Sequence, residues 1–213
     1  MNFDKLIEFL EKRLKEPTPG AIAHNRMKPK FPNGAPVQIK HPKPPKEGAV
    51  LILLNNQQGK AHFPLIQRPT YEGVHSGQIA LPGGKMESTD VSLLDTALRE
   101  TEEEIGIRKS DVQIIGTLSS FYVAASNYNV LPVIGKFESE PRFIPDKREV
   151  DEVINPRVID LIDKPKKKEK ELIVRGGVRL ISPYFHLEKK IVWGATAMML
   201  SEFEAILSDF RRE

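Results

Sequence analysis

The chain has 213 residues, of which 39% are hydrophobic and 29% charged, enough for one well-formed hydrophobic core. It contains no cysteine, which excludes disulfides, thiolate zinc sites and cysteine nucleophiles and suits a reducing compartment. The 32 basic and 29 acidic residues give a net charge of +3, a weak argument for nucleic acid as a partner and a better fit to a small anionic substrate. No apolar run reaches membrane-spanning length and no signal sequence follows Met1, so we expect a cytoplasmic protein without a membrane partner.

The first 47 residues are expected to form a helix and then an extended arm, both packed on the main domain. Apolar residues recur at helical spacing between residues 2 and 15, with charges between them, which predicts a docking helix. From Glu16 to Gly48 prolines recur and the apolar period disappears, which predicts the arm. The main domain is therefore expected to cover residues 48–213.

The main domain is predicted to alternate strands with two helices. The predicted strands are 49–54, 62–68, 78–81, 112–123, 129–137 and 149–154, followed by hairpins over 172–181 and 184–193. The charged run 164–171 is interpreted as a solvated loop, and residues 156–162 as a short helix. A second long helix is expected from about Ala195. This order predicts an α/β fold with a mixed sheet between helical layers.

Residues 81–107, LPGGKMESTDVSLLDTALRETEEEIGI, concentrate the chemistry of the chain. A Pro-Gly-Gly turn precedes a helix that we expect to be capped by Thr89 or Asp90 and to stop at Gly106. Successive side chains of an α-helix are rotated by about 100°, so three carboxylates share one face, opposite an apolar stripe. They are Glu100, Glu103 and Glu104. Such carboxylates raise one another's pKa and weaken the helix by repulsion between like charges. A bound Mg²⁺ ion, with Mn²⁺ as a substitute, would remove this repulsion. The alternative is a solvated acidic helix.

This pattern resembles the Nudix hydrolase box, in which a glycine and an acidic residue precede R-E-U-x-E-E-x-G-U, where U is bulky and aliphatic. Residues 99–107, RETEEEIGI, match it except at Thr101, and Asp90 occupies the acidic position. The gap from Gly84 to Arg99 is one residue longer than in the general pattern, which resembles the coenzyme A pyrophosphatase branch. The resemblance implies the Nudix α/β/α sandwich, with a mixed β-sheet between helices.

The preceding segment, residues 64–84, resembles the coenzyme A pyrophosphatase signature L-L-T-x-R-S-x3-R-x3-G-x3-F-P-G-G. Arg68, Gly77 and the Pro-Gly-Gly turn match, whereas Gly73 stands at the position of the second arginine. That departure removes a bidentate anion contact. Arg68, His75 and Gly77 are candidate substrate contacts. A structural salt bridge for Arg68 and a hydrogen-bonded turn for His75 are the alternatives.

Two later segments add to the resemblance. Ser126 and Asn127, between two predicted strands, are candidate substrate contacts. Residues 191–200, IVWGATAMML, resemble the I-W-G-x-T-A segment of the same branch, which would place Trp193 in the core or in a pocket wall.

The resemblance implies a hydrolase that cleaves the diphosphate bond of a nucleotide derivative. The metal ligands would be Glu100, Glu103, Glu104 and the Gly84 carbonyl. Arg99 would hold the glutamates in place through an i,i+4 pair with Glu103, and the general base would be a box glutamate or Glu149. The expected substrate is coenzyme A or an acyl-CoA. ADP-ribose, dinucleotide polyphosphates and nucleoside triphosphates remain open, as do a non-catalytic nucleotide-binding module and a homodimer.

Overall fold

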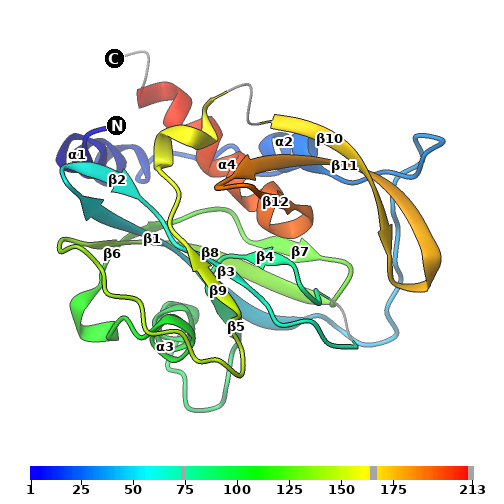
Figure 1. Ribbon diagram of the computed structural model, residues 1–213, viewed down its shortest axis with the longest axis horizontal. Helices are drawn as coiled ribbons and strands as arrows, with labels where there is room; N and C mark the ends of the chain where they lie inside the picture. Colours follow the sequence, from blue (N-terminus) through cyan, green and yellow to red (C-terminus); the bar gives the residue numbers. More distant parts are fainter. Residues whose placement is uncertain (73–74, 164–166, 211–213) are drawn as a thin grey trace.

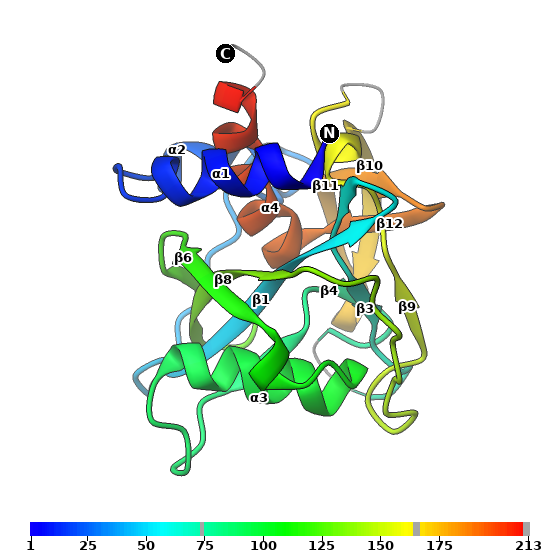
Figure 2. The same ribbon diagram turned by 90° about the vertical axis from the view of Figure 1, so that its left-hand side faces the viewer.

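The computed structural model describes residues 1–72, 75–163 and 167–210 (Figure 1). Within these residues the backbone forms a six-stranded mixed sheet and two three-stranded antiparallel sheets. The long helices are α1 (Phe3–Arg13), α3 (Leu93–Ile105) and α4 (Gly194–Phe210). Helix α3 lies on one side of the six-stranded sheet, and α1 and α4 lie on the other (Figure 2). The α/β class predicted from the order of elements is confirmed.

The six-stranded sheet is built around two long parallel strands. β1 (Lys46–Gln57) and β8 (Tyr128–Phe137) pair in register over ten residues of each strand. The other pairs are antiparallel. Their strands are β2 (Lys60–His62) and β5 (Gly83–Lys85), both on β1, with β6 (Gln113–Thr117) and β7 (Phe121–Val123) on β8. The single strand predicted over 112–123 is therefore two strands.

The alternation of side chains along β1 divides the core into two layers. Leu51 and Leu53 pack with Ala97 of α3, whereas Ile52 and Leu54 belong to the cluster that contains the buried side chains of α1 and α4. All five are fully buried, and each large apolar side chain stabilises the fold by about 1.5–3 kcal/mol. Because β1 is anchored on both faces, it fixes the position of α3 relative to the rest of the molecule.

The two smaller sheets flank this core. One has the order β4 (Ile79–Ala80), β3 (Leu65–Gln67) and β9 (Glu152–Ile154), and the other β10 (Lys167–Val174), β11 (Val178–Leu187) and β12 (Lys190–Trp193). The short helical elements are α2 (Ala21–His24), η1 (Asn25–Met27), η2 (Lys109–Asp111), η3 (Val158–Leu161) and η5 (Arg175–Gly177). Both predicted hairpins are present, as β10–β11 and β11–β12. No helix in the described ranges is long and apolar enough to cross a membrane.

The charged run 164–171 is not the predicted solvated loop. Residues 164–166 lie outside the described residues, and the remainder forms most of β10. The run lacks the apolar alternation that predicts a strand. Its backbone nevertheless pairs with β11, and its side chains contact other elements of the fold. Lys167 contacts Glu204 of α4, and Glu169 contacts Lys30 of the arm. Tertiary pairing thus overrides the weak local preference for a strand.

The arm between α1 and β1 is not wholly extended, because it contains α2 and η1. His24 of α2 lies 2.8 Å from the buried Glu202 of α4, which also accepts hydrogen bonds from the Gly20 N–H (2.8 Å) and the Ser119 hydroxyl (2.7 Å). These contacts hold the arm against α4. The division of the chain at residue 48 stays a prediction.

Candidate active site

The acidic helix α3 begins later than predicted. Its N-cap is Ser92, whose hydroxyl accepts a hydrogen bond from the Asp95 N–H at 3.2 Å, so the prediction of Thr89 or Asp90 as cap is wrong. The helix ends at Ile105, and Gly106 follows in the left-handed region with φ 73°, as the predicted stop requires.

Arg99 is the centre of the charged network on this helix. Its Nε donates to Asp90 Oδ1 at 2.7 Å and its Nη1 to Glu103 Oε2 at 2.9 Å, so the predicted i,i+4 pair is present. Its Nη2 lies 3.0 Å from Glu100 Oε1 and donates to the Lys85 carbonyl at 3.1 Å. One guanidinium therefore orients two of the three box glutamates and joins them to the end of the Pro-Gly-Gly turn.

Asp90 has a structural role that its place in the box pattern does not predict. Its buried carboxylate accepts hydrogen bonds from the Thr96 hydroxyl and the Glu87 N–H, both at 2.9 Å, besides those from Arg99. The Arg99 guanidinium holds the pKa of Asp90 well below its usual range. Asp90 therefore fixes the position of Arg99. In the sequence, the match of Asp90 to the acidic position of the box is the feature that marks this residue.

The three box glutamates have different surroundings. The side chain of Glu104 is 2% exposed, accepts a hydrogen bond from the Gly83 N–H at 2.8 Å and lies 3.8 Å from Arg68 Nη2, whereas that of Glu103 is 59% exposed. Burial raises the pKa of Glu104 to about 8, against the opposing effects of Arg68 and the Gly83 N–H. Burial also raises the pKa of Glu100, against Arg99.

The Pro-Gly-Gly turn brings backbone and carboxylate together because neither glycine has a side chain. A Cβ on Gly84 would lie 2.5 Å from Glu100 Oε2, and one on Gly83 would lie 2.3 Å from the Ala49 carbonyl. The Gly84 carbonyl oxygen faces β1, since a Cβ on Gly48 would lie 2.5 Å from it. The Gly83 carbonyl accepts a hydrogen bond from Arg68 at 3.4 Å and therefore lies on the Arg68 side of the turn.

The donor types of this region fit a divalent metal ion. As their side chains lie, no three acidic or histidine residues of the described part of the chain form a group able to hold a metal, and Glu100 and Glu103 are both engaged by Arg99. Carboxylate and carbonyl oxygens are nevertheless the ligands that Mg²⁺ takes in proteins. Burial raises the pKa values of Glu100 and Glu104, and a cation bound beside them would oppose this effect and favour their ionised forms.

The loop after β3 brings together the residues predicted to contact substrate. The Arg68 N–H donates to the Gln78 carbonyl at 3.0 Å, and His75 Nδ1 lies 3.0 Å from Gln78 Oε1. Burial lowers the pKa of His75, opposed by its hydrogen bond to Gln78, and the charge of Arg68 lowers it further. Gly77 follows with φ 65°. Gly73, which replaces the second arginine of the signature, lies outside the described residues.

Glu149 acts electrostatically on the box glutamates from a different part of the chain. The strand predicted from residue 149 begins at Glu152, and Glu149 lies exposed in the preceding turn. Its charge contributes to raising the pKa of both Glu100 and Glu104. The fold therefore brings this carboxylate within electrostatic reach of the box.

Ser126 and Asn127 lie in the turn between β7 and β8, where Asn127 joins the turn to the arm. Its amide oxygen accepts from the Tyr122 hydroxyl at 3.0 Å, and its amide nitrogen donates to the carbonyls of Lys43 and Pro44 at 3.1 and 3.2 Å. Among the residues that the structure describes, no hydrogen bond links Ser126 or Asn127 to the glutamates of α3.

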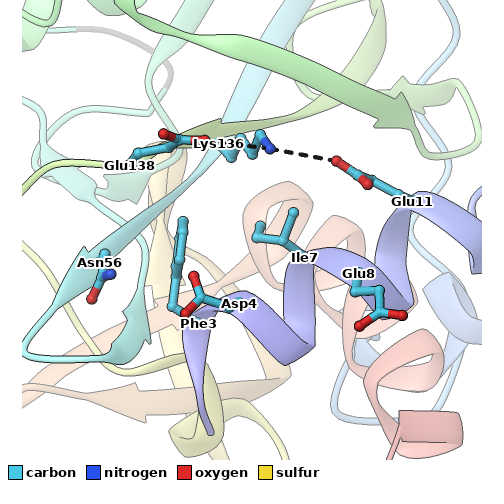
Figure 3. Close-up of a pocket in the computed structure, with 8 residues that line it drawn as sticks. All are labelled: Phe3, Asp4, Ile7, Glu8, Glu11, Asn56, Lys136 and Glu138. Atoms are coloured by element: carbon cyan, nitrogen blue, oxygen red, sulfur yellow. Dashed lines mark hydrogen bonds and ion pairs between the residues drawn. The ribbon is translucent and has the colours of Figure 1, made fainter.

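A hollow of about 470 Å³ lies apart from the box, between α1 and the ends of β1 and β8 (Figure 3). Phe3 and Ile7 contribute apolar surface, and Lys136 lies 3.5 Å from Glu11 and 3.6 Å from Glu138. None of the predicted site residues lines it, so it is not the candidate active site.

Comparisons with known proteins place this arrangement in a family. The family model of the NUDIX domain matches residues 45–173 of this chain. The uncharacterized Nudix hydrolase NudL of Pectobacterium atrosepticum is 31% identical over 143 residues, covering 63% of this chain and 69% of that protein. NudL of Escherichia coli is 30% identical over 159 residues, covering 70% of this chain and 82% of that protein.

A solved structure shows the same fold. The binary complex of a C. elegans Ap4A hydrolase has a TM-score of 0.51 at 18% identity, covering 78% of this chain and 99% of that chain. Together with the family match, this likeness confirms the predicted Nudix-type arrangement of a mixed sheet between helices. The chain belongs to the Nudix hydrolase family and is a hydrolase that acts on pyrophosphate bonds.

Proposed function

We propose that this Nudix hydrolase cleaves the diphosphate bond of coenzyme A or an acyl-CoA in a Mg²⁺-dependent reaction, releasing 3′,5′-ADP and 4′-phosphopantetheine or its acyl derivative. The observation that carries the proposal is the position of Arg68 beside the box, with its Nη2 3.8 Å from Glu104 Oε1. Arg68 belongs to residues 64–84, the segment that resembles the coenzyme A pyrophosphatase signature. The arrangement combines carboxylates for a metal with a cation for a phosphate.

The metal would be held by Glu100, Glu103, Glu104 and the predicted Gly84 carbonyl or, because the Gly84 carbonyl faces β1, by the Gly83 carbonyl in its place. When bound, it lowers the pKa of a coordinated water and neutralises charge on the phosphate oxygens. Arg99 orients Glu100 and Glu103. Burial against the Gly83 N–H fixes the position of Glu104, so the ligand set is supported on two sides by the protein.

Glu149 is the proposed general base. Its carboxylate is exposed and forms no hydrogen bond with the described residues, and it acts electrostatically on Glu100 and Glu104. A carboxylate so placed can accept a proton from the attacking water.

On the substrate side, Arg68 would pair with a phosphate oxygen, and His75 and Gly77 would shape the loop around it. The Asn127 amide is already occupied by Tyr122 and the arm. Substrate contact at Asn127 and Ser126 therefore stays a prediction, as do the cytoplasmic location, the lack of membrane and nucleic-acid partners and the homodimer.

A product assay tests the proposal. The purified protein with Mg²⁺ is incubated separately with coenzyme A, ADP-ribose, NADH, diadenosine polyphosphates and nucleoside triphosphates, and the products are identified by mass. We expect 3′,5′-ADP and 4′-phosphopantetheine from coenzyme A. Preferential cleavage of ADP-ribose or of another of these nucleotides would overturn the substrate assignment, and no cleavage of any compound would favour a non-catalytic nucleotide-binding module.

A further inference from the structure

One face of the β10–β11–β12 sheet combines lysines with aromatic rings. The register places Lys168 opposite Tyr184 and Tyr184 opposite Trp193, so the three side chains share a face. Lys170, two residues along β10, belongs to the same face. Within a strand, alternate residues point to the same side, and the four residues Lys168, Lys170, Tyr184 and Trp193 therefore define what we call the lysine–aromatic face.

The charged residues of β10 on the opposite face are all engaged. Lys167 contacts Glu204 and lies 5.4 Å from the centre of the Phe185 ring. Glu169 lies 3.2 Å from Lys30, and Glu171 lies 3.4 Å from Arg179. The internal electrostatic contacts of this strand are thus made from one side only.

Lys168 and Lys170 have no such partners. Both are exposed, and neither forms an ion pair or hydrogen bond with the part of the chain that the structure describes. Two positive charges therefore remain available on a single face, spaced two residues apart on an ordered strand. An ammonium group so placed can bind a phosphate monoester from solution.

The aromatic residues of this face lie outside the hydrophobic core. Trp193, the one tryptophan of the sequence, is half-buried and belongs to neither hydrophobic cluster, and the same holds for Tyr184. Neither ring stacks on another aromatic ring of the described residues. Aromatic rings of this kind bind nucleobases by stacking.

The sheet that carries this face also contacts the strand that leads to Arg68. Lys190 of β12 donates to Gln67 Oε1 at 2.8 Å, and Gln67 immediately precedes Arg68. β12 also lies beside β4, the strand that leads into the Pro-Gly-Gly turn (Figure 1). Trp193 is three residues further along β12, about 10 Å from Lys190 at the usual rise of a strand, and its side chain points to the other side of the sheet from that of Lys190.

We propose that the lysine–aromatic face binds the nucleotide half of the substrate. Tyr184 or Trp193 stacks on the base, and Lys168 and Lys170 bind a phosphate monoester that is not part of the cleaved diphosphate. This inference rests on the proposed function and deepens it. It makes the enzyme selective for nucleotide diphosphates that carry an additional ribose phosphate, as coenzyme A does at its 3′ position.

A fluorescence titration tests the face without turnover. Because Trp193 is the one tryptophan, its emission reports directly on the site. We expect 3′,5′-ADP to quench it and to bind at least about tenfold more tightly than 5′-AMP, as one or two charged contacts to the extra phosphate require. The Lys168→Ala/Lys170→Ala variant should lose this preference. The matched variant Lys5→Ala/Lys15→Ala, which removes two exposed lysines near the N-terminus, should keep it.

Either of two results would overturn the inference: emission that does not respond to 3′,5′-ADP, or a preference for 3′,5′-ADP that survives in Lys168→Ala/Lys170→Ala. A kinetic comparison adds a second readout. The ratio of kcat/KM for coenzyme A to that for dephospho-coenzyme A should fall about tenfold in this variant, through KM. An unchanged ratio would contradict selection by the face. If the wild-type protein cleaves neither compound, the proposed function fails, and the titration still decides whether the face binds a nucleotide phosphate.

Discussion

Three glutamates that are equivalent on a helical wheel differ in this fold. Glu103 is exposed, Glu104 is buried against the Gly83 N–H, and Glu100 fits against a glycine that has no Cβ. Helical spacing predicts that these side chains share a face. It cannot predict their burial, because that depends on the approach of a turn from another element.

Glu149 provides the residue-level test of the proposed base. In Glu149→Gln we expect kcat to fall about 10²-fold with little change in KM, because the amide cannot accept the proton but occupies the same space. Steady-state kinetics with saturating Mg²⁺ measure this. Glu140→Gln, at an exposed position on the same connection between β8 and β9, is the matched control and should behave as wild type. A kcat near wild type in Glu149→Gln would assign the base to a box glutamate.

At the scale of elements, α3 is held in place by a buried carboxylate. Asp90 accepts hydrogen bonds from Arg99, Thr96 and the Glu87 N–H, and so joins the turn before the helix to the helix itself. The box pattern records Asp90 as an acidic position. The contacts show that it stabilises the helix that carries the glutamates.

Replacing Asp90 should therefore destabilise the protein. In Asp90→Ala we expect the free energy of unfolding to fall by about 2–4 kcal/mol, because Arg99 and Thr96 lose a buried acceptor. Urea unfolding measures the difference. Glu103→Ala removes an exposed partner of the same arginine and should cost less than about 1 kcal/mol. Equal losses in the two variants would show that burial of Asp90 is not what holds Arg99.

Helices and strands that have a regular apolar pattern were predictable from the sequence. Those that depend on contacts with distant parts of the chain were not. The apolar run of β1 and the stripe of α4 predicted buried elements, and both are buried. The first part of β10, residues 167–171, was not predicted as a strand because its charged residues have no apolar alternation and are held by β11, the arm and α4. The cap of α3 was misplaced because several residues before the helix can accept a hydrogen bond. Thr101 departs from the apolar pattern, yet it is buried. Its hydroxyl can occupy this apolar site because it donates to the Ala97 carbonyl at 2.7 Å.

At the scale of the whole molecule, a buried carboxylate ties the N-terminal arm to the C-terminal helix. Although burial of Glu202 raises its pKa, hydrogen bonds from His24 and Ser119 and from the Gly20 N–H lower it below its usual value. His24 is the titratable group in contact with it. Folding therefore favours the ionised form of Glu202.

The sign of the shift predicts how this contact depends on pH. Because the folded pKa is lowered, the stabilisation is present above the usual glutamate pKa of 4.5 and is lost as the pH falls through the folded pKa. We expect Glu202→Gln to have a lower Tm than wild type at neutral pH. The difference should shrink as the pH falls below 4.5 and through the lowered pKa of Glu202. Thermal unfolding of both proteins at several pH values measures it, and a difference independent of pH would show that ionisation of Glu202 contributes nothing.

Metal-dependent catalysis by the box glutamates is tested most directly by comparing wild type and Glu103→Gln on the preferred diphosphate substrate, each with EDTA and then with excess Mg²⁺. Glu103 is largely exposed, so the variant should keep the circular dichroism and Tm of wild type. We predict that EDTA lowers the wild-type rate by at least about 10³-fold, that Mg²⁺ restores it, and that Glu103→Gln stays inactive with Mg²⁺. Hydrolysis that persists in EDTA, or a near wild-type rate in Glu103→Gln, would contradict the assignment.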